Sequence, residues 1–429
     1  MTTTPTPTGA NPMPPQTRSL LREPAFLRLW AGTTASGLAT WALPFVLGLA
    51  VLHRDLGAAG LGLVLAARTA GFLVAVAVGG VLADRHSRRA VVLWSALMAA
   101  AAAPLLTAGL GHSVALMTAA AALAGAGQGA CRPAFQALTA ETVAPEDRQR
   151  ANAAITMAVR SSTLAGPVLT SLLATFLDVR TLLLGIGLLW LIAALVPGRG
   201  ARAAAEPLDE PMPRTGFRTD FLEGMREARR HPWFLAGLAA LGAVITLGYS
   251  ATSVALPLIS RDRYGTEWVL AAAMTGYTLG ALGGAAVIAR WRPRSQGLVA
   301  FAGLAAYGFA PLSLMLPVHP LLVVAGYVLA GVGIELFNVP WFTAAQREVA
   351  PDKLARVSSL DFLVSYGLAP VGLALITPAV HAFGATAVLA ACTVVCFLVP
   401  AAAALVPTAR HFARTPRAPL VRPGAPARR

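Results

Sequence analysis

Five ionisable side chains interrupt long apolar stretches of the sequence: Arg68, Arg132, Arg160, Glu335 and Asp361. Charged groups are costly inside apolar segments, and where they occur they usually relay protons or contact ions and charged ligands. Glu335 is the most informative, because about ten residues, or on the order of 15 Å of helix, separate it from the nearest polar segment. A carboxyl group at that depth suits a proton carrier that alternates between charged and neutral forms.

Three of the other charges allow a simpler interpretation. Arg160 and Asp361 stand only a few residues from polar segments, and Arg68 stands closer to one than Glu335 does. Long side chains can extend along apolar surface to water, so snorkelling is the alternative for these residues. No acidic residue occurs between Leu29 and Leu52, so the first apolar segment offers no proton-binding carboxylate.

Aromatic residues near the middle of apolar stretches form a candidate stacking surface for a bulky ligand. They are Trp41, Phe45, Tyr249, Tyr277, Trp341 and Phe342. Packing between helices or contact with lipid is the alternative for several of them. The sequence shows no metal-ligand spacing and no nucleophile–base pair, and its three cysteines stand in apolar segments. We therefore expect neither an enzyme nor a bound metal or other cofactor.

Composition indicates which elements hold these residues. The 429 residues are 56% hydrophobic and only 12% charged, with a mean hydropathy of +0.65, whereas soluble domains carry about 25% charged residues. Charges that scarce cannot cover a water-facing surface, so lipid must surround much of the chain. The net charge of +15 lies in short Arg clusters between apolar runs, which argues against a nucleic-acid partner.

Twelve apolar runs approach or exceed the length of about 20 residues that a helix needs to cross a bilayer. They cover residues 29–52, 61–83, 90–110, 113–139, 152–175, 181–198, 234–259, 267–289, 297–317, 320–345, 357–378 and 384–406. Six runs precede a polar central segment and six follow it. The sequence therefore predicts an all-α membrane protein with twelve transmembrane helices in two six-helix bundles.

Hydrophilic segments divide the chain into five parts. We expect a disordered N-terminus at 1–28, a first bundle at 29–198, a linker at 199–233, a second bundle at 234–406 and a disordered tail at 407–429. In the linker, Phe221, Leu222, Met225 and Ala228 recur at helical spacing among charged residues. This pattern predicts an amphipathic helix on the membrane surface.

Basic residues predict the orientation, because connections rich in Lys and Arg stay in the cytoplasm. The N-terminus and every second connection after it hold most of the basic residues. The remaining connections hold Arg54, Arg180, Arg261 and Arg263. We therefore expect a multi-pass protein of the cell membrane with both termini in the cytoplasm.

The two halves of the sequence also repeat each other. Val-Ala-Pro-Glu-Asp-Arg-Gln-Arg at 143–150 stands opposite Val-Ala-Pro-Asp-Lys-Leu-Ala-Arg at 349–356, a shift of 349 − 143 = 206 positions. Because each half has an even number of spans, both have the same orientation, which makes them parallel repeats. Chance similarity between Ala-rich helices is the alternative, but the match includes Pro and charged loop residues.

The connection after the second span reads Gly80-Val-Leu-Ala-Asp84-Arg85-His-Ser-Arg88-Arg89. It resembles the signature of the major facilitator superfamily, Gly-x-x-x-Asp-Arg/Lys-x-Gly-Arg/Lys-Arg/Lys, with Ser87 in place of the second Gly. The resemblance implies a conformational-switch loop in which Asp84 contacts the N-terminus of the eleventh helix, near 357–361. A carboxylate there is favourable by about 0.3–1 kcal/mol, enough to bias a two-state equilibrium. A plain topological anchor is the alternative role of the Arg residues.

The fifth span contains Ser162-Thr-Leu-Ala-Gly166-Pro167-Val-Leu-Thr-Ser171. It resembles a relaxed form of the drug–proton antiporter motif Gly-x-x-x-Gly-Pro-x-x-Gly-Gly, with Ser or Thr at three of the glycines. With the Gly-Ala-Gly-Gln-Gly stretch at 125–129, the chain is similar to the exporter branch that includes macrolide-efflux and siderophore-export proteins. A generic packing face of small residues is the alternative for Gly166 and Pro167.

In this superfamily helices 1, 4, 7 and 10 line a central cavity, so the resemblance implies that Arg132 and Glu335 face each other across it. We expect them to pair in one conformation and to separate when a proton or substrate binds; a static ion pair is the alternative.

The expected function is export of a small amphipathic organic compound, such as a drug, antibiotic or siderophore, by a monomer that works by alternating access. The proton gradient is the expected driving force. The alternatives are an uncoupled or importing carrier and a non-transporting membrane sensor or assembly factor.

Overall fold

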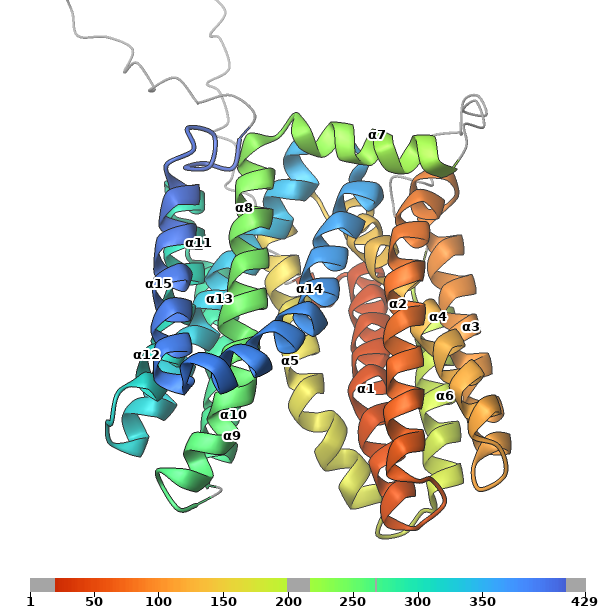
Figure 1. Ribbon diagram of the computed structural model, residues 1–429. Coiled ribbons are helices and arrows are strands. Elements are labelled where there is room, and N and C mark those ends of the chain that lie inside the picture. Colours follow the sequence, from red (N-terminus) through yellow and green to blue (C-terminus); the bar gives the residue numbers. More distant parts are fainter. Residues whose placement is uncertain (1–19, 199–216, 267, 414–429) are drawn as a thin grey trace, which may run out of the picture.

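The computed structural model describes residues 20–198, 217–266 and 268–413 (Figure 1). Most of the predicted disordered ends and the first part of the linker lie outside these residues. The described part of the N-terminal segment is helical, because Leu20 and Phe26 are buried against Val143 and Ala151. Ordered structure therefore begins before residue 29, where the sequence predicts the first bundle to start.

The described residues form helices and connecting loops, with no strand among them. The first half contains α1 (Pro24–Leu52), α2 (Ala58–Arg85), α3 (Arg88–Gly109), α4 (Val114–Thr142), η2 (Pro145–Asp147), α5 (Arg148–Leu173) and α6 (Val179–Leu195), with η1 (Leu20–Arg22) before them. After α7 (Phe217–Arg229), the second half contains α8 (Pro232–Ala243), η3 (Val244–Tyr249), α9 (Ser250–Asp262), α10 (Trp268–Arg290), α11 (Gln296–Ala305), η4 (Ala306–Gly308), α12 (Phe309–Met315), α13 (Pro320–Glu348), α14 (Leu354–Phe383) and α15 (Ala385–Ala404). Side chains of Ser87, Ser113 and Asp178 accept backbone N–H groups at the starts of α3, α4 and α6.

Among the described residues, 10 helical rods are long and apolar enough to cross a membrane. Two of them are composite, since α8, η3 and α9 form one rod and α11, η4 and α12 form another. α6 is apolar but has only 17 residues, and α5 contains three arginines among its 26 residues. With these two, the chain has the predicted twelve rods, and the predicted all-α membrane fold is confirmed.

The rods pack as two bundles side by side, α1–α6 in one and α8–α15 in the other (Figure 1). Between the bundles, α2 packs on α14 and α5 packs on α10. The repeat makes these two pairs equivalent, because α10 corresponds to α2 and α14 to α5. The predicted repeat is confirmed by the bounds of α4 and α13, which differ by 320 − 114 = 206 and 348 − 142 = 206 positions.

Two glycines at equivalent positions of the repeat allow close helix packing inside each bundle. A Cβ atom on Gly125 in α4 would lie 1.9 Å from the carbonyl oxygen of Arg68 in α2. A Cβ atom on Gly331 in α13 would lie 1.9 Å from the carbonyl oxygen of Tyr277 in α10. Only glycine permits these approaches, so the two glycines determine how near the backbones of Arg68 and Tyr277 come to the molecular axis.

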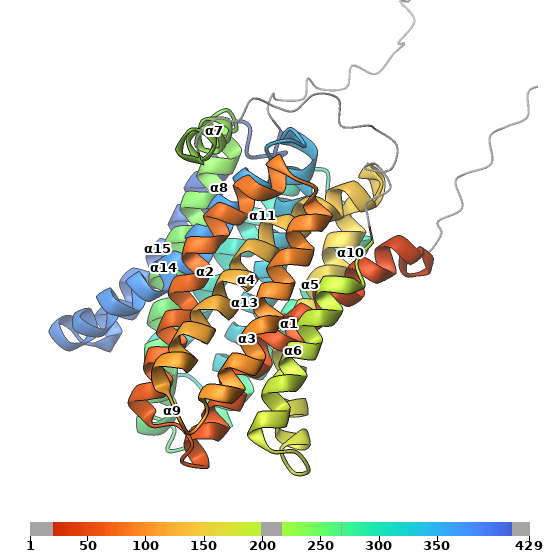
Figure 2. The same ribbon diagram turned by 90° about the vertical axis from the view of Figure 1, so that its right-hand side faces the viewer.

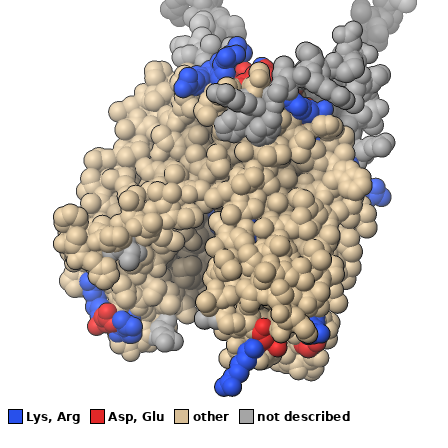
Figure 3. Space-filling view, turned by 45° about the vertical axis from the view of Figure 1, so that its right-hand side comes forward, with Lys and Arg blue, Asp and Glu red and all other residues tan. Residues whose placement is uncertain are grey.

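α7 lies crosswise over one end of the bundles (Figure 1, Figure 2). We call this end the α7 face and the other end the opposite face. α7 contacts α2 of the first half and α8 and α14 of the second. Ala228 is buried, whereas Leu222 is exposed, so only part of the predicted apolar side of this helix packs on the bundles. Charged side chains gather toward the two ends and leave a broad uncharged band between them (Figure 3), which suits a bilayer.

Candidate functional site

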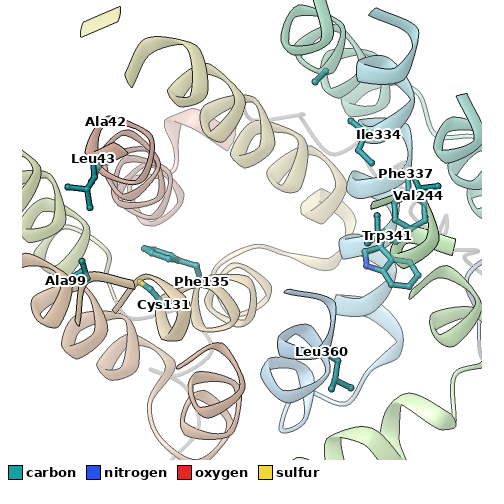
Figure 4. Packing of buried hydrophobic residues seen from close by; sticks show 14 of the residues in the cluster. Ala42, Leu43, Ala99, Cys131, Phe135, Val244, Ile334, Phe337, Trp341 and Leu360 are labelled. Atoms are coloured by element: carbon teal, nitrogen blue, oxygen red, sulfur yellow. The ribbon is translucent and has the colours of Figure 1, made fainter. Parts of the chain in front are cut away.

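A cavity of about 350 Å³ lies between the two bundles. Its walls come mainly from α1, α4 and α5 of the first half and from η3, α10, α13 and α14 of the second. Buried residues of the two bundles stand on either side of the space, with Phe135 and Cys131 on one side and Ile334 and Val244 on the other (Figure 4). A cavity of this size accommodates a small organic molecule.

Hydrogen bonds between the bundles close the cavity toward the α7 face. Asn152 donates to Thr343 Oγ1 and Gln346 Oε1, both at 2.9 Å. Arg148 Nη1 donates to the carbonyl oxygen of Gln346 at 2.6 Å, and Gln149 donates to backbone carbonyls at the end of α10. These contacts join the start of α5 in the first bundle to the ends of α10 and α13 in the second.

The opposite face is open. Among the described residues, no hydrogen bond joins the bundles beyond the level of Arg160 and Glu335, and Figure 3 shows a hollow between the bundles away from the α7 face. The structure therefore represents one state of a two-bundle molecule, closed at the α7 face and accessible from the opposite face.

The deepest cross-bundle contact is an ion pair between Arg160 and Glu335. Arg160 Nε lies 2.7 Å from Glu335 Oε1. The Glu335 side chain is 0% exposed, whereas that of Arg160 is 24% exposed. The second carboxylate oxygen, Oε2, accepts no hydrogen bond from any described residue, and the guanidinium of Arg160 lies 5.9 Å from the ring centroid of Tyr277. The pair therefore joins the two bundles through one of the two carboxylate oxygens.

The partner of Glu335 in this state is therefore Arg160, and not Arg132 as the sequence interpretation expected. The reason is the packing of α5, which lies against α10 and α13 and directs Arg160 into the cavity. Arg160 accordingly does not snorkel to the surface. The ion pair joins α5 and α13, which are not the pair of helices that the symmetry argument selected.

Arg132 lines the cavity without a partner. It is half-buried, and its guanidinium hydrogen-bonds to none of the described residues. Arg68 lies nearby: its Nη2 donates to Gln128 Oε1 at 2.8 Å and to the carbonyl oxygen of Thr40 at 3.0 Å. Both acceptors are neutral and lie inside the bundle, so Arg68 does not snorkel either. Gln128 precedes Arg132 by one helical turn on α4, which brings the two arginine charges onto one wall.

Asp361 is buried at the other wall, and no described cationic side chain forms an ion pair with it. Its Oδ1 accepts a hydrogen bond from Trp341 Nε1 at 3.0 Å, and its side chain also lines the cavity. Trp341, expected to stack on a ligand, is instead fully buried, with its ring stacked on Phe234 at 4.8 Å and on Phe337 at 5.2 Å. Trp341 therefore holds Asp361 in place from behind the cavity wall.

Four of the six aromatic candidates line the cavity: Trp41, Tyr249, Tyr277 and Phe342. Phe45 lies elsewhere on α1. Sequence reasoning missed five further aromatic side chains that line the cavity: Phe135, Trp190, Tyr307, Phe362 and Tyr366. Tyr307 lies in the η4 break of a composite rod, and Phe362 and Tyr366 lie one turn apart on α14. That spacing is the only sequence signal that pointed to them.

The switch loop lies where the resemblance implied. Asp84 accepts backbone N–H groups of Ala355 at 3.0 Å and Arg356 at 2.9 Å, and it also accepts from Arg356 Nε at 3.0 Å. These donors form the first turn of α14, slightly earlier than expected. A Cβ atom on Gly80 would lie 2.7 Å from Ser359. Glycine at this position thus lets α2 approach α14.

The arginines of this loop have different partners. Arg88 Nη1 lies 2.6 Å from Glu141 Oε1, and Arg88 also donates across the bundles to the carbonyl oxygen of Pro351. Arg89 donates to the carbonyl oxygen of Leu195 at 3.4 Å within the first bundle. Arg85 has a polar or electrostatic partner as well. Arg88 is therefore placed to hold both bundles together.

α7 extends this network of charges. Glu223 accepts from Arg356 Nη1 at 3.0 Å and lies 3.2 Å from Lys353 Nζ. Partial burial acts to raise the pKa of Glu223, but the hydrogen bonds and charges of Lys353 and Arg356 outweigh it and hold the pKa below its ordinary value. Glu227 lies 3.5 Å from Lys353. α7 is therefore tied to the first turn of α14, beside Asp84.

The glycine of the helix-5 motif packs on α1. A Cβ atom on Gly166 would lie 3.2 Å from the Cβ atom of Trp41, and Pro167 removes one backbone N–H from the middle of α5. Gly166 thus contributes to the seating of Trp41, which lines the cavity. No group of three or more His, Cys, Asp or Glu side chains that could hold a metal occurs within the described ranges.

Comparison with known proteins agrees with this architecture. Residues 29–373 match the family model described as Major Facilitator Superfamily. The crystal structure of the human organic anion transporter MFSD10 (TETRAN) superposes with a TM-score of 0.71 at 17% sequence identity, and the match covers 89% of this chain and 99% of that one. No curated protein sequence matches the chain. At 17% identity the second likeness concerns the fold alone, while the family match spans most of the chain: the protein is a membrane transporter of the Major Facilitator Superfamily.

Proposed function

We propose that the protein exports a small amphipathic organic compound from the cell by alternating access, in exchange for protons. The observation that carries this proposal is the Arg160–Glu335 ion pair, which joins the bundles at the closed end of the cavity. The concentration of arginines in the connections at the α7 face supports a cytoplasmic location for that face. The cavity would then open to the outside, in the cell membrane, with both termini in the cytoplasm.

The ion pair supplies a mechanism for proton exchange. In the outward-open state, a proton from outside reaches Glu335 through the cavity and neutralises the carboxylate. The attraction for Arg160 is then lost, and one contact that keeps the cytoplasmic side closed is weakened. When the bundles separate at that side, Glu335 releases its proton inward and a substrate enters. Return to the outward-open state restores the pair and carries the substrate out.

The test uses everted membrane vesicles with an acidic interior and a fluorescent pH probe. Addition of a transported compound to wild-type vesicles should collapse the gradient, and Glu335→Gln should abolish the collapse. Glu146→Gln is the matched control, because Glu146 is an exposed residue of the α7 face outside the cavity. Uptake of labelled compound without proton movement would refute antiport and favour an uncoupled carrier.

The uncoupled or importing carrier remains the second candidate. The observation that favours it is that α1 has no acidic residue between Leu29 and Leu52 and so offers no proton-binding carboxylate. In that case the Arg160–Glu335 pair has a static structural role. A membrane sensor or assembly factor is the third candidate, and the finding that would favour it is a co-purifying partner together with no transport of any compound.

A further inference from the structure

The cavity wall formed by α4, with α2 packed behind it, holds two arginines, and none of its described cavity-lining residues is acidic. Arg132 reaches the cavity with no hydrogen-bond partner among the described residues. Arg68 lies behind Arg132 and donates hydrogen bonds to the neutral oxygens of Gln128 and Thr40. The Arg68 guanidinium is bonded to Gln128, one helical turn from Arg132 on α4, so the two like charges occupy the same side of the cavity. A cation that is both unpaired and next to another cation is unusual inside a membrane protein, because buried charges are normally paired.

The acids of the cavity do not compensate this wall. Glu335 is committed to Arg160 at 2.7 Å. Asp361 accepts the indole N–H of Trp341 on the α13–α14 side and has no ion pair with either arginine. Water can solvate Arg132 while the cavity is open. When the bundles close around the cavity that water is lost, so closure without a compensating charge is costly.

An aromatic surface lies next to this positive wall. Phe342 and Phe362 are stacked at 6.1 Å, and the ring of Tyr366 lies 6.4 Å from that of Phe362 and 4.7 Å from that of Phe72 on α2. Phe342, Phe362 and Tyr366 all line the cavity. An aromatic or otherwise flat apolar group packs well on such a surface.

We propose that the cavity selects organic anions, with the anionic group bound by Arg132 and supported by the charge of Arg68, and the apolar body packed on Phe342, Phe362 and Tyr366. The inference rests on the proposed transport function and names its substrate class. A planar carboxylate or sulfonate can accept two parallel hydrogen bonds from one guanidinium. The anion replaces the water that Arg132 loses on closure, so anionic cargo lowers the cost of closing the bundles around the loaded cavity.

The site is separate from the proposed proton-binding pair. Arg132 lies on α4, whereas Arg160 and Glu335 join α5 to α13. Substrate binding and proton binding are therefore open to separate measurement.

The experiment measures binding directly, without transport. Full-length protein in phosphatidylcholine nanodiscs is titrated calorimetrically with 1-naphthalenesulfonate and with 1-naphthylmethylammonium, which share a ring system and carry opposite charges. The wild type should bind the sulfonate at least tenfold more tightly. Arg132→Gln should weaken sulfonate binding about 10- to 100-fold, since it removes a charge-assisted hydrogen-bond donor. Arg132→Lys should lose less, because it keeps the charge without the planar fork.

Arg180→Gln is the control for charge alone, because Arg180 is exposed at the start of α6 on the opposite face and its loss should leave binding unchanged. Equal binding of the two probes by the wild type, or tighter binding of the ammonium, would overturn the proposal whether or not the variants fold. An Arg132→Gln protein that binds like the wild type would overturn it as well.

The same two probes, added to the everted vesicles, separate the two proposals. Proton movement driven by the ammonium and not by the sulfonate would leave the exporter function standing and refute anion selectivity. Arg132-dependent sulfonate binding without any proton movement would leave the site standing and refute the antiport.

Discussion

The Arg160–Glu335 pair predicts an asymmetric response to the loss of either partner. Glu335 is 0% exposed and Arg160 is 24% exposed, so a glutamate without its arginine is stranded away from water, whereas an arginine without its glutamate can be partly solvated from the cavity. Breaking a buried pair costs about 3–5 kcal/mol. Because the pair joins the two bundles, the cost of breaking it should destabilise the state closed at the α7 face relative to other states.

Two limits bracket the effect of Arg160→Gln. The stranded carboxylate either remains charged at the full cost or takes up a proton, and neutralising an ordinary glutamate at pH 7 costs about 3.7 kcal/mol. A shift of about 3–4 kcal/mol changes the ratio of the two states by two to three powers of ten. Glu335→Gln should change the ratio of the two states less than Arg160→Gln does. The double variant should return that ratio most of the way to its wild-type value, since a neutral pair leaves no buried charge without a partner.

The assay is the distance between spin labels in nanodiscs. One label pair reports the opposite face, on Cys introduced at Arg180 and Arg261, and a second reports the α7 face, at Ala144 and Arg294; all four positions are exposed. Arg160→Gln should shorten the first distance and lengthen the second, and the effect should grow with rising pH because neutralising the stranded carboxylate then costs more. Equal shifts in the two single variants, or a double variant worse than either, would refute the reasoning.

Three further predictions concern the contacts around the cavity. Asp84→Ala removes three charge-assisted hydrogen bonds at the start of α14 and should destabilise the state closed at the α7 face by about 1.5–3 kcal/mol or more. The same α7-face labels should then report a longer distance; an unchanged distance would contradict a role of Asp84 in holding this face closed. The bridge from Glu223 to Lys353 should be fully formed at neutral pH and lost only as pH falls below the ordinary range of glutamate, because the pKa of Glu223 is held down; faster amide exchange in α7 already at pH 6 would argue against it. Gly331→Ala places a methyl group 1.9 Å from the carbonyl oxygen of Tyr277 and should destabilise the second bundle by about 1–3 kcal/mol or more, measured as a lower Tm, whereas an alanine at Gly283, which meets no neighbour, should cost far less.

The sequence alone was sufficient for the architecture, because lipid leaves few options to a chain this apolar. A run of about 20 apolar residues must become a helix to satisfy its own backbone, so the runs predicted the rods. The repeat indicated the two bundles, and the apolar run at 152–175 predicted α5, although α5 as a whole contains three arginines. The Asp84 contact was implied by the resemblance of residues 80–89 to the superfamily signature.

The partners inside the cavity were decided only by the tertiary structure. The sequence gives the depth of Arg132, Arg160 and Glu335 along their helices, but an ion pair also depends on which helices are neighbours and how each is rotated. α5 packs against α13 closely enough for Arg160 to take the place expected for Arg132. Arg132 thereby has no ion-pair partner among the described residues and lines the cavity.

Trp341 shows the same limit for aromatic residues. Its position in mid-span is equally compatible with a cavity wall and with a packed core. The stacking of its ring on Phe234 and Phe337 shows that it belongs to the packed core. The depth of a residue in the membrane follows from its position along the helix, because each residue adds about 1.5 Å. The direction of a side chain acquires meaning only when neighbouring helices are in place, because packing between rods, and not the periodicity of one rod, determines what each face meets.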